Sequence, residues 1–237
     1  MANNEVIKLK LSYFNFGGKA ESIRLALSAL EIPFEDFRFA NREEFLAMKE
    51  SGKLNFGQVP MLEVWTGDGK HHVLTQSVAL MRFVAKLGCV KSPGKAQLYP
   101  ADDPITAARI DAIMDQEADA FVGLRVSKYK ERFGLGFLND EKNKDLVDKI
   151  TEDCNTVVVP RHLGFLEKQL QQNGSTWLAG TEGPSIADYF WVPVLRSLQG
   201  GWSGDKEILG KFPALVDLIN RFMALPEVAK YYKNHEN

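Results

Sequence analysis

The stretch IKLKLSYFNFGGKAESIRLALSAL, residues 7–30, decides how the first part of the chain folds. Apolar and polar side chains alternate over residues 7–13, and this pattern predicts a β-strand. The Gly-Gly pair that follows breaks the strand, and residues 20–30 combine helix-forming residues with apolar side chains at helical spacing. A proline then ends the helix and starts a second predicted strand over residues 34–39. Strand, helix and strand at these lengths indicate a parallel βαβ unit.

Two more strands and a helix are expected next. Residues 61–65 and 72–75 are apolar segments on either side of an Asp-Gly turn, which predicts a β-hairpin. From Ser77 onward, apolar residues recur at the i, i+3, i+4 and i+7 positions of an amphipathic helix, and Gly88 is expected to end it. We therefore expect an α/β domain over residues 1–88, in the order β-α-β and then β-β-α.

The rest of the chain has helical periodicity. Residues 89–104 are rich in Pro, Gly and charge and are interpreted as a linker. Beyond them we expect an all-helical domain over residues 105–237. One long helix is predicted over residues 105–132, and a second over residues 145–172 with a kink at Pro160.

A local signature marks the start of a later helix. Ser185-Ile186-Ala187-Asp188 precedes an apolar run and matches a capping box in which Asp replaces the usual Glu. Further helices are expected over residues 215–225 and 228–231. The predicted fold class is therefore an α/β domain followed by an all-α helical bundle.

Composition argues against several classes of function. The 237 residues include 45% hydrophobic and 25% charged residues, and the net charge is −2. Proteins that bind nucleic acid or anionic membranes usually have a clustered excess of basic residues. This chain has a small net negative charge, so neither is an expected partner. No apolar run reaches the roughly 18 to 20 residues of a membrane span, and the first residues lack a signal-peptide pattern, so we expect a cytoplasmic protein. The two cysteines, Cys89 and Cys154, form no C-x-x-C motif, which argues against a disulfide scaffold or a redox dithiol.

Several short motifs, taken in order, resemble those of the cytosolic glutathione transferases. They are Tyr13-Phe14-Asn15, Gly18-Lys19-Ala20-Glu21, Gly57-Gln58-Val59-Pro60, Gln76-Ser77 and Ser185-Ile186-Ala187-Asp188. The resemblance covers essentially the whole chain and is nearest to the tyrosine-type sigma class, close to the mu and pi classes. It implies a thioredoxin-like N-terminal domain that holds glutathione, a helical-bundle C-terminal domain that holds the second substrate, and a homodimer.

Tyr13 is the expected catalytic residue. A tyrosine at a strand end is usually a packing residue, because its ring is a large apolar surface. Here the strand runs into a Gly-Gly turn and a helix, where backbone N–H groups and the positive helix end favour an anion. A free thiol has a pKa of roughly 8.5, and lowering it by about two units requires about 2.7 kcal/mol. A hydrogen bond to a charged group contributes roughly 1.5 to 3 kcal/mol, so Tyr13 is expected to donate to the glutathione thiolate and not to act as a base.

The resemblance implies further contacts with glutathione. A cis bond before Pro60 would turn the backbone of Val59 outward. Its N–H and C=O groups could then pair with the cysteinyl part of glutathione, as those of a neighbouring strand do. Gln76 and Ser77 open a helix whose N-terminus would receive the γ-glutamyl carboxylate. Ser77 is also a natural helix cap, and the two roles are compatible.

The glycyl end of glutathione is expected to meet Lys49 and Gln58. The family often has Arg at the first and third positions of the stretch Gly17-Gly18-Lys19, so here the electropositive support near the catalytic tyrosine reduces to Lys19. Phe45 stands where many relatives place a Trp that hydrogen-bonds the glycyl group, and a phenyl ring has no N–H to donate.

Asp111, Asp115 and Asp119 recur every four residues and share one helix face. A solvated acidic stripe is the ordinary interpretation, and a divalent cation held between two subunits is another. By position, Asp119 resembles the acid that reaches across the dimer interface to the γ-glutamyl ammonium of glutathione bound by the other subunit. The electrophile pocket is expected between the first loop and the long helix, with three candidate residues: Phe14, Val126 and Tyr129.

These features together predict a glutathione S-transferase. Bound glutathione, the co-substrate, would ionise beside Tyr13, and its thiolate would attack an electrophilic carbon or a peroxide oxygen of an apolar molecule in a detoxification reaction that needs no metal. Two alternatives stay open: a glutathione-dependent isomerase of lipid endoperoxides, and a non-enzymatic structural or ligand-carrying member of the fold. Retention of the tyrosine with its companion motifs argues against the second. Arg24 is predicted to be structural, with backbone and acid partners.

Overall fold

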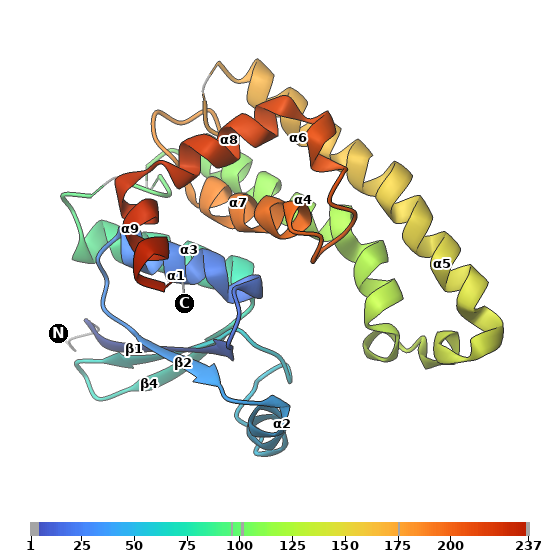
Figure 1. Cartoon of the computed structure of the whole chain (residues 1–237). Helices are drawn as coiled ribbons and strands as arrows, with labels where there is room; N and C mark the ends of the chain where they lie inside the picture. The colour runs from blue at the N-terminus through green and yellow to red at the C-terminus, as the bar shows by residue number, and fades with distance from the viewer. Residues whose placement is uncertain (1–4, 96, 101, 175, 236–237) are drawn as a thin grey trace. The chain divides into compact units, whose positions relative to one another are not determined.

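The structure, a computed structural model, describes residues 5–95, 97–100, 102–174 and 176–235 (Figure 1). The chain divides into two compact units. The first comprises the chain up to residue 101 and from residue 225 onward, and the second comprises residues 102–224. Within the described ranges, no helix combines the length and the apolarity that a bilayer crossing needs.

A four-stranded sheet forms the centre of the first unit, with the strands in the order β2-β1-β3-β4. The strands are β1 (Val6–Phe14), β2 (Glu35–Phe39), β3 (Met61–Thr66) and β4 (His71–Thr75). β1 pairs in parallel with β2 and antiparallel with β3, and β3 pairs antiparallel with β4. The predicted βαβ unit and the predicted hairpin are therefore confirmed.

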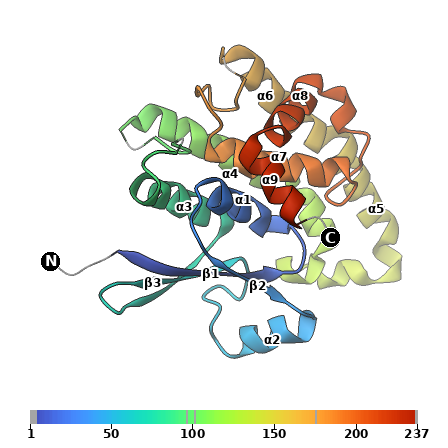
Figure 2. The same ribbon diagram turned by 60° about the vertical axis from the view of Figure 1, so that its left-hand side comes forward.

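The helices of the first unit are α1 (Glu21–Ala29), α2 (Arg42–Glu50), α3 (Ser77–Lys91) and α9 (Pro226–His235). Figure 2 shows α1 and α3 on one face of the sheet and α2 on the opposite side. α2 has no counterpart among the predicted elements. α9 packs against α1 and buries Val228 and Tyr231, whose hydroxyl donates to Glu21 Oε2 at 3.4 Å.

The core of the first unit lies between the sheet and the pair α1 and α3. Fully buried side chains from the sheet, from α1 and from α3 fill it: Leu11, Leu62, Ile23, Leu27, Leu80 and Val84. The prediction that Gly88 ends its helix is wrong, since α3 continues to Lys91. A Cβ atom on Gly88 would lie 2.7 Å from Leu30 Cδ1, so the glycine serves the close approach of α3 to the end of α1.

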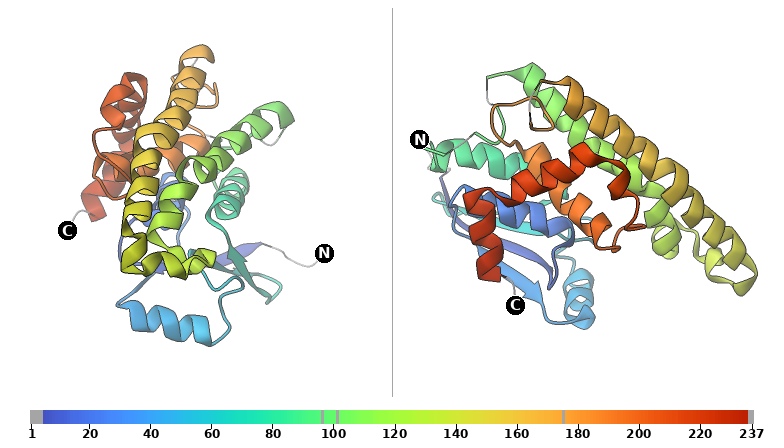
Figure 3. Two further views of the ribbon diagram at one scale, coloured as in Figure 1. Left: turned by 90° about the vertical axis from the view of Figure 1, so that its right-hand side faces the viewer. Right: turned by 45° about the horizontal axis from the view of Figure 1, so that its top comes forward.

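The second unit is built from helices in its described part. They are α4 (Pro104–Lys128), α5 (Lys144–Asp153), α6 (Val159–Gln172), α7 (Ile186–Gln199) and α8 (Pro213–Met223). Figure 3 shows α4 lying alongside the nearly continuous run of α5 and α6. The predicted long helix is confirmed but ends four residues early, because a 3₁₀ turn at Lys130–Phe133 follows it.

The junction of α5 and α6 differs from the predicted single kinked helix. A π-helical turn, Cys154–Val158, separates them, and Pro160 stands in the first turn of α6, where its missing N–H is tolerated. Gly123 of α4 faces this turn so closely that a Cβ atom there would overlap the Cys154 sulfur. The turn therefore lies directly against α4.

The capping box predicted at the start of α7 is confirmed. Ser185 Oγ accepts the N–H of Ala187 at 3.2 Å, and Asp188 Oδ2 accepts the N–H of Ser185 at 2.8 Å. Asp188 is fully buried, and its Oδ1 accepts the N–H of Leu178 at 2.9 Å. Burial raises the pKa of Asp188 to about 6, although these hydrogen bonds act in the opposite direction.

Candidate active site

The register of the sheet brings three predicted site segments to one edge. In the β1–β3 pair, Ser12 lies opposite Met61, so Tyr13 and the residues before Met61 are at the same end of the sheet. In the β3–β4 pair, Met61 lies opposite Thr75, so Gln76 leaves the sheet at that end too. The expected catalytic tyrosine, the segment that precedes β3 and the start of α3 therefore share one edge.

The Tyr13 side chain is buried, with 7% of its surface exposed. Its hydroxyl oxygen accepts the backbone N–H of Lys19 at 3.1 Å. Lys19 belongs to a 3₁₀ turn, Gly18–Ala20, that leads directly into α1. A phenolic hydroxyl that accepts one hydrogen bond can still donate its own proton, so this arrangement is suited to a Tyr13 that acts as a donor.

Gly18 is the residue that lets the backbone pass over this hydroxyl. Its φ is 49°, in the left-handed region, and a Cβ atom would lie 2.6 Å from the hydroxyl oxygen of Tyr13. The sequence pattern identified the Gly-Gly pair as a strand breaker and as a turn near a helix end, but not as a close contact of the Tyr13 hydroxyl. The signal for its second role is its position, a few residues beyond a tyrosine at a strand end.

Arg24 holds the loop that connects Tyr13 to α1. The side chain is fully buried, and its Nε donates to both carboxylate oxygens of Asp36 at 3.0 and 3.1 Å. The two terminal nitrogens donate to the carbonyl oxygens of Phe16 at 2.9 Å and Phe14 at 3.4 Å. The predicted backbone and acid partners are confirmed, and the guanidinium carbon also lies 5.9 Å from the centre of the Tyr13 ring.

Four phenylalanines pack together beside this loop, namely Phe14, Phe16, Phe39 and Phe45. The rings of Phe14 and Phe16 stack with centroids 5.6 Å apart. Phe45 of α2 approaches Phe14 to 5.0 Å and Phe39 to 5.8 Å. Phe45 therefore anchors α2 to the end of β1, while its contact with a ligand stays a prediction.

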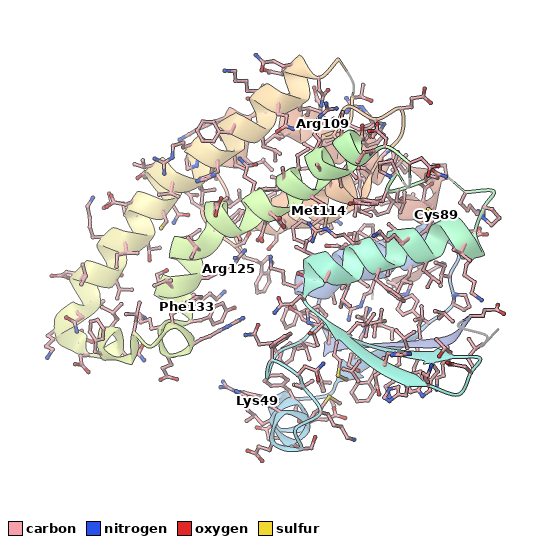
Figure 4. The ribbon with its side chains drawn as sticks, turned by 180° about the vertical axis from the view of Figure 1, so that it is seen from behind. Lys49, Cys89, Arg109, Met114, Arg125 and Phe133 are labelled. Atoms are coloured by element: carbon pink, nitrogen blue, oxygen red, sulfur yellow. The ribbon has the colours of Figure 1, made fainter. Side chains whose placement is uncertain are left out.

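Lys49 lies in the last turn of α2, next to the segment that leads to Gln58. A Cβ atom on Gly57 would lie 3.3 Å from Lys49 Cε, so the stem of the lysine passes close to this backbone. Both Lys49 and Gln58 are exposed, and Figure 4 shows Lys49 on α2. The two residues predicted to meet the same end of a ligand are thus neighbours.

The peptide bond between Val59 and Pro60 is cis, as predicted. Gln76 is the N-cap residue of α3 and has a φ of 72°, a conformation that costs a residue other than glycine about 1 to 2 kcal/mol. Ser77 is the first residue of the helix. The first N–H groups of a helix have no acceptor within it, so this end of α3 is suited to an anion.

The remaining predicted residues belong to the second unit. Asp119 is exposed on α4, four residues after Asp115, as the acidic stripe requires. Val126 is partly buried, and Tyr129, just after α4, is 50% exposed. Phe14 belongs to the first unit, so a pocket that it shares with these two residues stays a prediction. Among the described residues, no group of three or more His, Cys, Asp and Glu side chains is arranged to hold a metal ion.

Two family models match the chain. The model of the glutathione S-transferase N-terminal domain matches residues 9–86, and that of the glutathione S-transferase C-terminal domain matches residues 130–235. The first match covers the sheet with α1 to α3, and the second covers helices from α5 onward. The fold is therefore a thioredoxin-like N-terminal domain with a helical C-terminal domain.

Relatives of the whole chain point to the same family. The chain is 34% identical over 225 residues to glutathione S-transferase 1 of Ascaris suum, which covers 94% of each protein. It is 29% identical over 224 residues to hematopoietic prostaglandin D synthase of Homo sapiens, again over 94% of each. The solved structure of prostaglandin synthase D of Nilaparvata lugens aligns with a TM-score of 0.73 at 28% identity, over 96% of this chain and 98% of that one. The chain therefore belongs to the glutathione S-transferase family.

Proposed function

We propose that the protein binds glutathione along the sheet edge at which Tyr13, Val59 and Gln76 lie, and that the glutathione thiol ionises beside Tyr13. The observation that carries this proposal is the common edge set by the strand register. A tripeptide laid along it would have its cysteinyl backbone at Val59 and its sulfur near the Tyr13 hydroxyl.

The chemical step follows from the surroundings of Tyr13. Its hydroxyl accepts the N–H of Lys19, which polarises the hydroxyl and strengthens it as a donor. Donated to the sulfur, that hydrogen bond contributes roughly 1.5 to 3 kcal/mol, or about one to two pKa units of the thiol. The nearby cation of Arg24 has the sign that favours a thiolate. The thiol proton passes to solvent water. The thiolate then forms a bond to the electrophilic atom, either as a halide or an alkoxide departs or by addition to an enal, whose carbanion then takes a proton from water.

Both ends of glutathione have proposed partners. The γ-glutamyl carboxylate meets Gln76 and Ser77 at the N-terminus of α3, and its ammonium meets Asp119 of the partner subunit. The glycyl carboxylate meets Lys49 and Gln58, with Lys19 close to the thiol. Phe45 and Pro60 shape the site by packing and by backbone geometry.

The assembly and the second substrate are also part of the proposal. We infer a cytoplasmic homodimer of the sigma-like type that conjugates glutathione to apolar electrophiles in detoxification. The electrophile lies against Phe14, Val126 and Tyr129. Residues 1–88 form the glutathione domain and residues 105–237 the domain that supplies the rest of this pocket, joined by residues 89–104.

Replacement of Tyr13 by Phe tests the chemistry directly, because it keeps the ring and removes the donor. The pKa of bound glutathione should rise by about one to two units, and kcat/KM near neutral pH should fall about ten- to a hundredfold. Thiolate absorbance of the binary complex, titrated with pH, measures the shift. Tyr232→Phe is the matched control in the same unit and should leave the titration unchanged. An unchanged titration in Tyr13→Phe as well would assign thiol activation to the helix end or to Lys19.

Replacement of Asp119 by Ala tests the dimeric site. The apparent KM for glutathione should rise, while turnover at saturating glutathione changes less, since Asp119 contacts only the γ-glutamyl end. Asp115→Ala, one helical turn earlier on α4, is the control and should leave KM unchanged. A monomer by light scattering that binds glutathione with full affinity would remove Asp119 from the site.

A glutathione-dependent isomerase is the second candidate, because one relative reported above is named hematopoietic prostaglandin D synthase and another prostaglandin synthase D. The two reactions differ in their use of glutathione: transfer consumes one glutathione per turnover, and isomerisation regenerates it. Free thiol measured during turnover of aryl halides, enals, hydroperoxides and a lipid endoperoxide separates them. Loss of thiol with the first two and none with the endoperoxide would show both activities in one site.

A further inference from the structure

The sequence contains a single Asn-Gly pair, Asn173-Gly174, which directly follows α6 in the second unit. Asn173 is the C-cap residue of that helix, and its backbone N–H donates to the carbonyl oxygen of Gln169 at 3.1 Å. Gly174 has a φ of 70°, in the left-handed region where a glycine ends a helix without strain. A Cβ atom on Gly174 would meet nothing within 4 Å, so the backbone conformation alone favours glycine there.

The Asn173 side chain holds the chain segment that follows this turn. Its amide nitrogen has two N–H groups, which donate to the carbonyl oxygens of Trp177 and Leu178 at 2.9 Å each. Gly180 packs closely against the same residue, since a Cβ atom on Gly180 would lie 3.4 Å from Asn173 Cβ. The turn therefore depends on the amide of residue 173 and on the glycine of residue 174.

The segment held in this way belongs to the core of the second unit. Trp177 and Leu178 are both buried. Both backbone groups of Leu178 are fixed, because its N–H donates to Asp188 Oδ1 at 2.9 Å and its carbonyl oxygen accepts from Asn173. An aspartate at position 173 would have no N–H to donate and would direct a negative charge at two carbonyl oxygens. Conversion of this amide to an acid therefore removes two hydrogen bonds and adds a repulsion.

An asparagine amide is lost most easily when glycine follows it, because glycine has no side chain to hinder attack by its own nitrogen. The backbone nitrogen of Gly174 forms a bond to Asn173 Cγ, the bond from Cγ to the side-chain nitrogen breaks, and ammonia leaves with the proton of the Gly174 N–H. Water then opens the cyclic imide at either of its carbonyl carbons and gives an aspartate or an isoaspartate. In the folded chain, the amide must first leave the two carbonyl oxygens that it binds.

We propose that Asn173 is a site of spontaneous deamidation that the folded chain protects and that unfolding exposes. The modified chain lacks the amide that closes the turn after α6, so a chain that stays unfolded long enough refolds to a less stable protein. The fraction of deamidated chains is therefore a permanent record of the time spent unfolded. The site does not depend on the proposed glutathione chemistry, because it shares no residue with it.

The first experiment measures deamidation of the full-length protein at mildly alkaline pH, in buffer and in guanidinium chloride. Mass spectrometry of the peptide that contains Asn173 follows the replacement of the amide NH₂ by a hydroxyl group. The rate should be about tenfold or more higher in guanidinium chloride, because attack in the folded chain requires two hydrogen bonds to break. Asn143, which precedes Lys144, is the control in the same digest and should keep its amide far longer in the unfolded chain. Gly174→Ala should slow the loss at Asn173 in guanidinium chloride.

The second experiment compares the stability of Asn173→Asp with that of Asn220→Asp. Asn220 is exposed on α8 in the same unit. Both variants exchange an amide for an acid, but the first also loses the hydrogen bonds to Trp177 and Leu178. Asn173→Asp should lower the ratio of folded to unfolded chains about tenfold or more, and unfolding in guanidinium chloride measures this as a lower midpoint. Asn220→Asp should change the midpoint clearly less.

Two results would overturn the proposal. The first is an Asn173 amide that is lost as fast in the folded chain as in the unfolded one, or no faster than that of Asn143 in the unfolded chain. The second is an Asn173→Asp variant that is as stable as Asn220→Asp. The rates are measured on the unmodified chain, so they decide the proposal even where Asn173→Asp does not fold.

Discussion

Among the residues that the structure describes, the charged side chains with no exposed surface are Arg24 in the first unit and Asp188 in the second. Arg24 has a charged partner, Asp36, and also binds backbone carbonyl oxygens of the loop after Tyr13. Asp188 is held by neutral donors, the N–H groups of Leu178 and Ser185 and the hydroxyl of Ser185. The first charge therefore shapes the loop after Tyr13, whereas the second caps a helix.

This difference shows what a buried charge contributes in each place. A buried charge that has a partner of opposite sign and further hydrogen bonds is compensated for its loss of water. A carboxylate that is held only by neutral donors has a larger free-energy cost of burial in its ionised form. This cost raises the pKa of Asp188. This contrast between the two buried charges can be tested with variants that remove either charge and with one that disturbs only the loop after Tyr13.

Replacement of Arg24 by Met should have the largest effect. It leaves Asp36 without its buried partner and frees the loop carbonyls, and breaking a buried pair in this way typically costs about 3 to 5 kcal/mol. Urea unfolding measures the loss. Arg38→Met is the control, since Arg38 donates to the same carboxylate at 2.8 Å but is 31% exposed, and should lose clearly less. Equal losses in the two variants would show that burial of Arg24 is not what matters.

Replacement of Asp188 by Asn should change how stability depends on pH. The pKa of Asp188 is raised to about 6 from an ordinary 3.8, so the folded state favours the protonated acid, and the associated stability is full below about pH 4 and lost as pH rises through 6. A shift of about two units corresponds to on the order of 3 kcal/mol.

The quantity to measure is the unfolding free energy of the unmodified protein minus that of Asp188→Asn, at steps between pH 4 and 7. It should fall as pH rises, because Asn does not titrate. Asp140→Asn, at an exposed acid, should give a difference without this slope. A flat difference for Asp188→Asn would mean that Asp188 is ionised throughout.

Replacement of Gly18 by Ala should have a smaller effect on stability and a specific one on chemistry. An alanine in the positive-φ conformation of Gly18 lowers the stability of the fold by about 1 to 2 kcal/mol. The added methyl group would also overlap the Tyr13 hydroxyl. Gly52→Ala has a φ of 74° and open space around it, so it has the same backbone cost without the contact. Only Gly18→Ala should raise the pKa of bound glutathione, measured by thiolate absorbance.

Much of the first unit could be predicted because its patterns are local. Alternation over residues 7–13 and the Asp-Gly turn predicted β1 and the β3–β4 hairpin, whereas the register that brings their ends to one edge came from the structure. α2 was missed although Asn41 and Glu44 form a recognisable helix start, in which the Asn41 side chain accepts the N–H of Glu44 at 2.9 Å. Its short, mostly polar sequence offers little periodicity.

The errors elsewhere arise from contacts between distant residues. Gly88 looks like a helix terminator, and only the packing of Leu30 against it shows its role. The π-helical turn begins at Cys154, which packs against Gly123 of α4, and a contact between residues so far apart in sequence leaves no signal in local periodicity. In the candidate site, the order of the motifs indicated Tyr13 and Gln76. The hydrogen bonds from Arg24 to the carbonyl oxygens of Phe14 and Phe16 depend on the conformation of the loop, which the sequence pattern does not reveal.

The return of α9 to the first unit has a consequence for biosynthesis. A ribosome makes the sheet and the Tyr13 loop before the second unit, but the helix that covers α1 and reaches Glu21 is made after it. Until residues 226–235 have been made, the surface of the first unit that Val228 and Tyr231 cover remains open, so this unit reaches its final form only after the helices of the second unit have been synthesised.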